Sequence, residues 1–222
     1  IGNIKLTNLI DTNNISFENN NEILRKNNFW CAASTHEGEE IICLKTHLIC
    51  KKVMKDIKTI IIPRHINRSK KIKELCNRLD LSVQILNSKE FIQNGKEIII
   101  INSFGDLLKY FKYSKSVFMG KSLIKNLQEV GGQNPIEAAK MNCQIYHGPF
   151  VYNFKEIYEL LKLHNLSQEI KEEKELAEKI LFDFKNSSKK PNEKSKVINN
   201  LGDEILQKSL KEIKGIFKNA NI

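Results

Sequence analysis

The sequence predicts an α/β fold: a doubly wound, parallel sheet with helices on both of its faces. Two patterns predict it. Short apolar runs alternate along the chain with longer stretches in which apolar residues recur at helical spacing. The run Ile57–Ile62 is dominated by β-branched residues and is stopped by Pro63, which is typical of a strand buried on both faces of a parallel sheet. Ligands of such sheets bind outside the carboxyl ends of the strands, so functional residues are expected there.

The expected strands are short apolar runs bounded by polar, Gly or Pro residues. The first, Phe29–Ala33, opens onto a polar loop, and the second is Ile57–Ile62. The later strands are predicted at Val83–Leu86, Glu97–Ile101, Val117–Met119 and Gln144–Tyr146.

The expected helices lie before, between and after these strands. In Glu37–Met54, the spacing of Ile41, Leu44, Leu48 and Val53 predicts a helix with one apolar face. The other helices are predicted at Glu22–Asn27, Ser69–Leu79, Gly105–Lys112, Pro135–Lys140 and Phe154–Leu163.

The pattern changes near the carboxyl end, where two amphipathic helices are predicted at roughly Ser167–Phe184 and Lys194–Lys218. We therefore divide the chain into a linker with the first helix (1–27), a ligand-binding α/β domain (28–165) and a helical extension (166–222). The chain begins at Ile1 without a Met, on a run typical of a strand or linker, which indicates a fragment whose partner half is missing.

The composition is that of a globular, basic protein, with 41% hydrophobic residues and a formal net charge of +10. That charge favours phosphorylated ligands, nucleic acid or an anionic membrane without choosing between them, and a solvated Lys-rich surface also accounts for it. No apolar run approaches the ~20 residues of a membrane span and no signal peptide is visible, so any membrane contact is expected to be peripheral or to belong to the missing half. The five cysteines show no C-x-x-C pair and no zinc spacing, which indicates reduced core thiols and no metal site.

Polar residues follow the first strand in the run Ser34-Thr35-His36-Glu37-Gly38-Glu39-Glu40. Ser or Thr followed by Glu at a helix start is capping chemistry, which is one interpretation of this run. The other is ligand binding, because His36 lies in a polar loop at the edge of the sheet where ligands bind. A Ser-His-acid triad is not expected, since residues this close in sequence rarely reach the required geometry and no nucleophile elbow is present.

Two arginines follow the second strand in Pro63-Arg64-His65-Ile66-Asn67-Arg68, although only four of the 36 basic residues are arginines. A guanidinium offers phosphate a planar bidentate fork that lysine lacks. Arg64 lies just beyond the strand and ahead of a helix, so it is the candidate phosphate ligand. The alternative is a surface pair of arginines that forms ion pairs with acids.

Two glycine-containing segments follow later strands. In Phe104-Gly105-Asp106 the glycine allows the backbone to approach a ligand, although a simple turn would use it as well. In Gly131-Gly132-Gln133-Asn134-Pro135-Ile136-Glu137, Asn and Pro mark a helix start, and Glu137 could accept hydrogen bonds from a ribose. Capping explains Asn134 and Pro135 but not the paired glycines.

In this order and spacing the clusters resemble those of the Kdo (3-deoxy-D-manno-octulosonic acid) transferase family, beginning with Gly2-Asn3-Ile4-Lys5 and ending with Gly148-Pro149 and Asn153-Phe154. The resemblance implies the Rossmann-like carboxy-terminal domain of an inverting B-type glycosyltransferase. Such an enzyme transfers Kdo from CMP-Kdo to the lipid A precursor, lipid IVA, in the lipopolysaccharide synthesis of Gram-negative bacteria. The CMP contacts that it implies are Pro63, Arg64, Phe104, Gly105, Asp106, Asn134, Pro135, Ile136 and Glu137.

The resemblance also assigns roles outside the nucleotide site. Lys5 matches a lysine that stabilises the transition state, and Ser34, Thr35 and His36 are candidate donor contacts. The general base is a glutamate of the absent amino-terminal half, so we expect no transfer by this chain alone. The implied partners are CMP-Kdo, the lipid acceptor and the cytoplasmic face of the inner membrane, bound peripherally, with no cofactor, metal or nucleic acid.

The sequence departs from the family at two places. Phe104-Gly105-Asp106 stands where the family has Met-Gly-Glu, and Gln133 stands where it has His. The shorter acid puts the contact of Asp106 in doubt, whereas backbone contacts at Phe104 and Gly105 survive. Other interpretations stay open at this point: another B-type glycosyltransferase or sugar-nucleotide epimerase, a basic nucleic-acid-binding module, or a degenerate or split-gene product that binds CMP-Kdo without catalysis.

Overall fold

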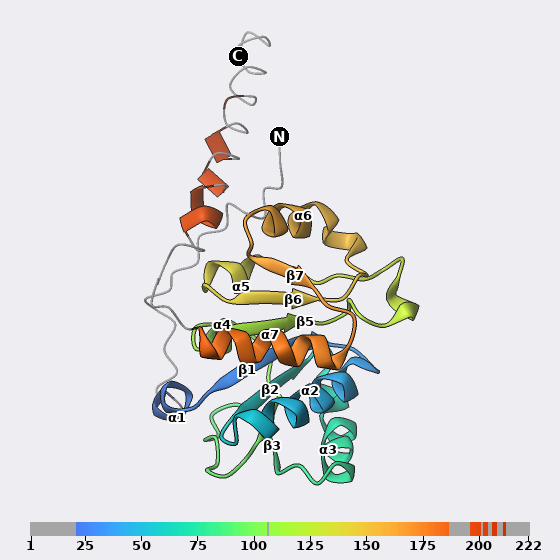
Figure 1. The fold of residues 1–222 in the computed structure, drawn as a ribbon, viewed down its shortest axis with the longest axis vertical. Coiled ribbons are helices and arrows are strands. Elements are labelled where there is room, and N and C mark those ends of the chain that lie inside the picture. Colours follow the sequence, from blue (N-terminus) through green and yellow to red (C-terminus); the bar gives the residue numbers. More distant parts are fainter. Residues whose placement is uncertain are drawn as a thin grey trace.

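The structure, a computed structural model, describes residues 21–105, 107–186, 196–200, 202–203, 206–207 and 211. Within these residues, one sheet of seven parallel strands forms the centre of the molecule, in the order β3-β4-β2-β1-β5-β6-β7 (Figure 1). The strands are β1 (Phe29–Thr35), β2 (Lys58–Pro63), β3 (Val83–Leu86), β4 (Ile98–Ile101), β5 (Ser116–Met119), β6 (Gln144–His147) and β7 (Ser167–Glu169). The doubly wound parallel sheet predicted from the sequence is confirmed.

The strand order places a switch point between β1 and β5. From β1 the chain adds β2 beside it, then β3 at the edge of the sheet and β4 between β2 and β3, and it then returns to the other side of β1 to add β5, β6 and β7 in order. Connections leave the switch point in opposite directions, so a crevice forms outside the carboxyl ends of these two strands.

Helices cover both faces of the sheet. One face carries α1 (Asn21–Lys26), α4 (Leu107–Phe111), α5 (Ile136–Lys140) and α6 (Lys155–Leu163), whose apolar side chains join one core cluster. The other face carries α2 (Glu39–Val53), α3 (Ser69–Arg78) and α7 (Glu173–Lys185), which join a second cluster. Figure 1 shows α7 lying beside α2, the helix that it packs against.

Alternating side chains of the central strands serve the two cores. Cys31 and Ile60 belong to one cluster, whereas Ala32 and Ile61 belong to the other, because successive residues of a strand point to opposite faces. Helices cover both faces of the sheet and exclude water, so every position of a central strand favours an apolar residue. Each fully buried Ile contributes about 1.5–3 kcal/mol to folding stability. This is the physical reason for the apolar runs in the sequence.

The predicted elements recur within a few residues of their expected bounds, with one correction. The helix predicted from Ser167 is wrong at its beginning: Ser167–Glu169 forms β7, parallel to β6, and the helix starts at Glu173. A three-residue edge strand bonded on one side needs no apolar run, so its sequence gives no strand signal. Of the second predicted helix, Lys194–Lys218, residues 196–200 are helical and most of the others lie outside the described residues.

Candidate functional site

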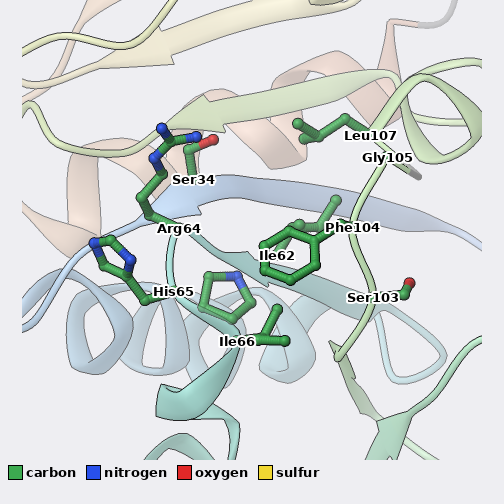
Figure 2. A pocket seen from close by; sticks show the side chains of 10 residues that line it. Ser34, Ile62, Arg64, His65, Ile66, Ser103, Phe104, Gly105 and Leu107 are labelled. Carbon is green, nitrogen blue, oxygen red and sulfur yellow. The ribbon is translucent and has the colours of Figure 1, made fainter.

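A cavity of about 310 Å³ opens at the carboxyl ends of β1, β2 and β4. Five residues predicted from the sequence as ligand contacts line it, from three separate segments: Ser34, Pro63, Arg64, Phe104 and Gly105. Figure 2 shows Arg64, from the end of β2, across the cavity from Phe104, in the loop that follows β4. The fold thus brings these segments together at the edge of the sheet where a ligand was expected.

Arg64 is held by its backbone while its side chain remains exposed. Its N–H donates to the carbonyl of Thr35 at 3.0 Å, which ties the end of β2 to the end of β1. Among the described residues the Arg64 guanidinium has no hydrogen-bond or ion-pair partner. A planar cation of this kind at the mouth of a cavity is suited to bind a phosphate.

Arg68 has the opposite surroundings. Its guanidinium donates to both carboxylate oxygens of Glu40, at 3.0 and 3.1 Å, and forms an ion pair with Glu37 at 3.2 Å. Glu40 is buried, and its burial raises the pKa of that carboxyl although the Arg68 guanidinium opposes this shift. The alternative interpretation of the arginine pair, ion pairing with acids, therefore holds for Arg68 and not for Arg64.

The loop after β4 presents an aromatic ring and open backbone to the cavity. Phe104 is 77% exposed and lines the cavity, so its ring is accessible to a ligand there. Gly105 has a φ of +82°, a left-handed conformation that glycine adopts without strain. Asp106 lies outside the described residues, and so does Lys5.

The end of β1 contributes one residue to the cavity and two beside it. Ser34 lines the cavity with a φ of +55°, where the register with β2 shifts between Ala33 and Thr35. Thr35 is fully buried and does not line the cavity, and its hydroxyl has no hydrogen-bond partner among the described residues. His36 is half-buried, and its ring lies edge-on to that of His65 with centroids 5.8 Å apart.

Sequence reasoning missed the role of Glu39, a fully buried acid in the first turn of α2. Its carboxylate accepts four backbone N–H bonds of 2.7–3.0 Å, one from His36 and three from Lys121, Ser122 and Leu123. The bond from His36 is the local one that a capping box leads one to expect. The other three come from the loop after β5, so one carboxylate joins the two strand ends at the switch point.

The start of α5 lies on the same face of the sheet as α4, which it contacts. The side-chain oxygen of Asn134 accepts a hydrogen bond from the N–H of Ile136 at 3.1 Å, so the predicted cap is present, with Pro135 preceding the first turn. Glu137 is half-buried in that first turn. These residues do not line the 310 Å³ cavity, although they share its edge and face of the sheet.

The paired glycines have a packing explanation. A Cβ atom on Gly131 would lie 2.2 Å from the carbonyl oxygen of Phe150, so only glycine fits there. Gly131 in turn accepts a hydrogen bond from the N–H of Asn153 at 3.0 Å, and the Asn153 side chain donates to Val130 at 2.7 Å. The pair therefore fixes the loop before α5 against the segment that follows β6.

A second cavity, of about 480 Å³, lies near the ends of β6 and β7 and against α6. It is lined by residues such as His147, Tyr152, Lys155 and Tyr158, and by none of the predicted contacts. We assign the site to the smaller cavity, because that cavity lies nearer the switch point and combines an unpaired guanidinium with an exposed ring.

The described residues contain no group of three or more His, Cys, Asp or Glu side chains that could hold a metal ion. All five cysteines are buried, as the sequence predicts, and none forms a disulfide. No helix within the described ranges is both long and apolar enough to cross a bilayer.

Comparisons of the sequence with curated proteins and of the fold with solved structures both find proteins named for Kdo. No protein-family model matches the chain. The sequence is 29% identical, over 163 residues, to the 3-deoxy-D-manno-octulosonic acid transferase of Haemophilus influenzae, an alignment that covers 68% of this chain and 37% of that protein. The chain therefore spans little more than a third of this relative's length.

Two solved structures define the fold. The C-terminal CMP-Kdo binding domain of WaaA from Acinetobacter baumannii matches with a TM-score of 0.68 and 22% identity, over 83% of this chain and 92% of that domain. The trehalose-6-phosphate synthase OtsA matches with a TM-score of 0.52 and 12% identity, over 90% of this chain and 44% of that protein. The expected fold, a Rossmann-like α/β domain like those of these two proteins, is confirmed.

Proposed function

We propose that this chain is the CMP-Kdo-binding half of a 3-deoxy-D-manno-octulosonic acid transferase, the class of protein that its sequence and fold resemble. One observation supports this most directly. The cavity at the strand ends gathers Ser34, Pro63, Arg64, Phe104 and Gly105, which are residues that the resemblance assigns to the donor. No observation favours a nucleic-acid-binding module or an epimerase over this function.

In the proposed complex, CMP binds between the walls of the cavity. The unpaired Arg64 guanidinium takes the phosphate through its fork, and the backbone of Gly105 approaches the nucleotide closely. The exposed Phe104 ring supplies a flat apolar surface for the pyrimidine. Glu137 extends the site along the same edge toward the ribose, where a carboxylate accepts hydrogen bonds from the diol.

The proposed reaction is a single in-line displacement at the anomeric carbon, with inversion. An acceptor hydroxyl loses its proton to a base outside this chain and attacks, while the bond to the phosphate oxygen breaks and CMP leaves. Negative charge develops on the leaving phosphate, and a preorganised cation beside it stabilises the transition state. Arg64 is our candidate for this role, together with Lys5, and we expect these residues to bind donor without transferring it alone.

The acceptor and the location belong to the same proposal. The remaining two thirds of such a transferase would supply the general base and the surface for the lipid A precursor. We place the assembled enzyme on the cytoplasmic face of the inner membrane as a peripheral protein, where both a nucleotide donor and a lipid acceptor are accessible.

A nucleotide titration tests the proposal. We expect CMP to bind the purified chain, measured by isothermal titration calorimetry, with at least tenfold higher affinity than UDP. The expectation follows because the site offers one guanidinium for one phosphate, and UDP brings a second phosphate and a different base edge. Equal affinity for the two nucleotides, or preference for UDP, would point to another sugar-nucleotide-binding protein.

A further inference from the structure

The loop after β5 holds a lysine in a backbone conformation that lysine rarely adopts. Lys121 has a φ of +59°, in the left-handed region that disfavours residues with a Cβ. Its N–H donates to Glu39 at 2.7 Å, and its carbonyl accepts from the N–H of Gly132 at 2.6 Å. The neighbouring Gly120 lies against the backbone of β1, since a Cβ there would be 2.6 Å from the carbonyl oxygen of Ser34. The surroundings thus impose this conformation, and strained positions of this kind concentrate at functional sites.

Lys121 lies at the switch point of the sheet. It follows β5 by two residues, β5 pairs with β1, and ligands of open α/β sheets bind in the crevice between such strands. The same oxygen of Glu39 accepts from the N–H groups of Lys121 and His36, at 2.7 and 2.9 Å, so the two loops are in direct contact.

The charges at this edge are unbalanced. Arg64 follows β2, His36 follows β1 and Lys121 follows β5, so basic groups extend across three adjacent strands. The pKa of His36 is lowered, mainly because its ring is withdrawn from water, and the nearby Lys121 ammonium adds to this shift.

The acidic side chains of this region already have hydrogen-bond or ion-pair partners. Glu39 is saturated by four backbone N–H groups, and Glu37 and Glu40 are paired with Arg68. Within the described part of the chain, neither Lys121 nor Arg64 has an acidic partner. Neighbouring strands are about 4.8 Å apart, so two unpaired cations begin about 10 Å apart and can converge on one ligand through their long side chains.

We propose that Lys121 binds the carboxylate of the acidic sugar while Arg64 binds the adjacent phosphate. The inference rests on the proposed function and adds a residue that determines donor specificity. In a CMP-activated 2-keto sugar acid, the anomeric carbon bears both the phosphate oxygen and the carboxylate, so the donor presents two neighbouring anions. CMP itself has only one of them. Lys121 therefore distinguishes the sugar donor from its nucleotide product.

Binding of two probes to the chain, CMP and freshly prepared CMP-Kdo, tests the assignment by calorimetry in the cold. We expect Lys121→Gln to weaken CMP-Kdo about 5- to 30-fold, because a charge-assisted bond to the carboxylate is lost. CMP affinity should change less than twofold. Lys121→Arg should retain most of the CMP-Kdo affinity.

A glycine variant separates ligand binding from folding. Lys121→Gly relieves the left-handed backbone, so we expect the thermal unfolding midpoint to rise by roughly 2 °C while CMP-Kdo binding falls as in Lys121→Gln. A merely structural lysine would move stability and binding in the same direction. Lys89→Gly is the matched control, because Lys89 has a φ of +68° in the exposed loop after β3, and its replacement should leave both affinities unchanged.

The two proposals fail in different ways. If CMP does not bind the unaltered chain, the proposed function is wrong. If CMP binds, but Lys121→Gln weakens neither probe or weakens both equally, the assignment of Lys121 is overturned and the proposed function stands.

Discussion

Arg64 and Arg68 are close in sequence, yet their surroundings differ: one guanidinium is free to bind a ligand and the other is held in an ion pair. Arg68 joins α3 to α2 by a bidentate pair with the buried Glu40, and removing one partner would leave a charge buried alone. Arg64 has no such partner among the described residues: its backbone N–H donates to the carbonyl of Thr35, and its side chain lines the cavity. Its charge remains available to a ligand.

Replacing Arg64 by lysine should separate the effect of its positive charge on turnover from the effect of its bidentate geometry. In the proposed full-length transferase we expect Arg64→Lys to lower turnover about 10²–10³-fold, since lysine keeps the charge but loses the bidentate fork. Steady-state transfer assays with CMP-Kdo and the lipid acceptor measure this. Arg78→Lys, at the exposed end of α3, is the control and should retain normal turnover. Comparable rates for the two variants would remove Arg64 from the proposed site.

At the scale of elements, the Glu39 carboxylate joins the start of α2 to the loop after β5. Three of its four donors are more than 80 residues away in sequence, so these hydrogen bonds form only when the sheet has assembled. The arrangement fixes the relative positions of the two loops that flank the switch point. It therefore links the stability of the fold to the shape of the candidate site.

Glu39→Gln should destabilise the chain by about 1–3 kcal/mol, because the amide presents N–H groups to backbone donors and leaves buried groups unpaired. Urea unfolding monitored by circular dichroism measures the change in free energy. Glu156→Gln is the control: it alters an exposed acid in the first turn of α6 and should change stability by less than about 0.5 kcal/mol. Equal stability of the two variants would contradict the structural role of Glu39.

The sequence predicts those elements whose signal is local. Ile57–Ile62 predicts a buried strand because burial on both faces requires apolar residues at successive positions. Ser167–Glu169 carries no such signal, since an edge strand exposing Gln168 and Glu169 needs no apolar side chains.

The same distinction, between local signals and contacts of distant segments, holds for the site. Arg64 and Gly105 stand out by type and position, whereas Glu39 and Lys121 gain their roles from contacts between distant segments.

At the scale of the whole molecule, a buried histidine makes stability depend on pH. His47 on α2 is fully buried, its Nδ1 is 2.9 Å from the hydroxyl of Thr59, and its Nε2 has no hydrogen-bond partner among the described residues. Burial lowers the pKa of His47 to about 4, although the Glu97 carboxylate opposes this shift. The folded state therefore binds the proton more weakly than the unfolded state does.

The direction in which stability changes with pH follows from this difference. The unfolded chain takes up the His47 proton as the pH falls below about 6.5, whereas the folded chain resists until about pH 4, so stability is lost in that window. Between pH 7 and pH 5 we expect His47 to contribute a loss of about 2 kcal/mol, measured by urea unfolding at both values. His47→Gln should reduce the pH dependence by that amount, whereas His164→Gln, at an exposed histidine, should preserve it. An unchanged pH dependence in His47→Gln would exclude His47 as its source.

Both outer strands of the sheet are poor templates for an incoming chain. On one side β7 offers only three residues and exposes Gln168 and Glu169. On the other side β3 is only four residues long, and its Gln84 side chain donates to the carbonyl of Phe91 and accepts from the N–H of Gln93, so the loop after β3 packs against this strand. Strand addition between molecules is the usual route by which exposed sheets aggregate. Concentrated samples of this Lys- and Ile-rich chain should therefore resist ordered self-association even though the sheet has two open ends.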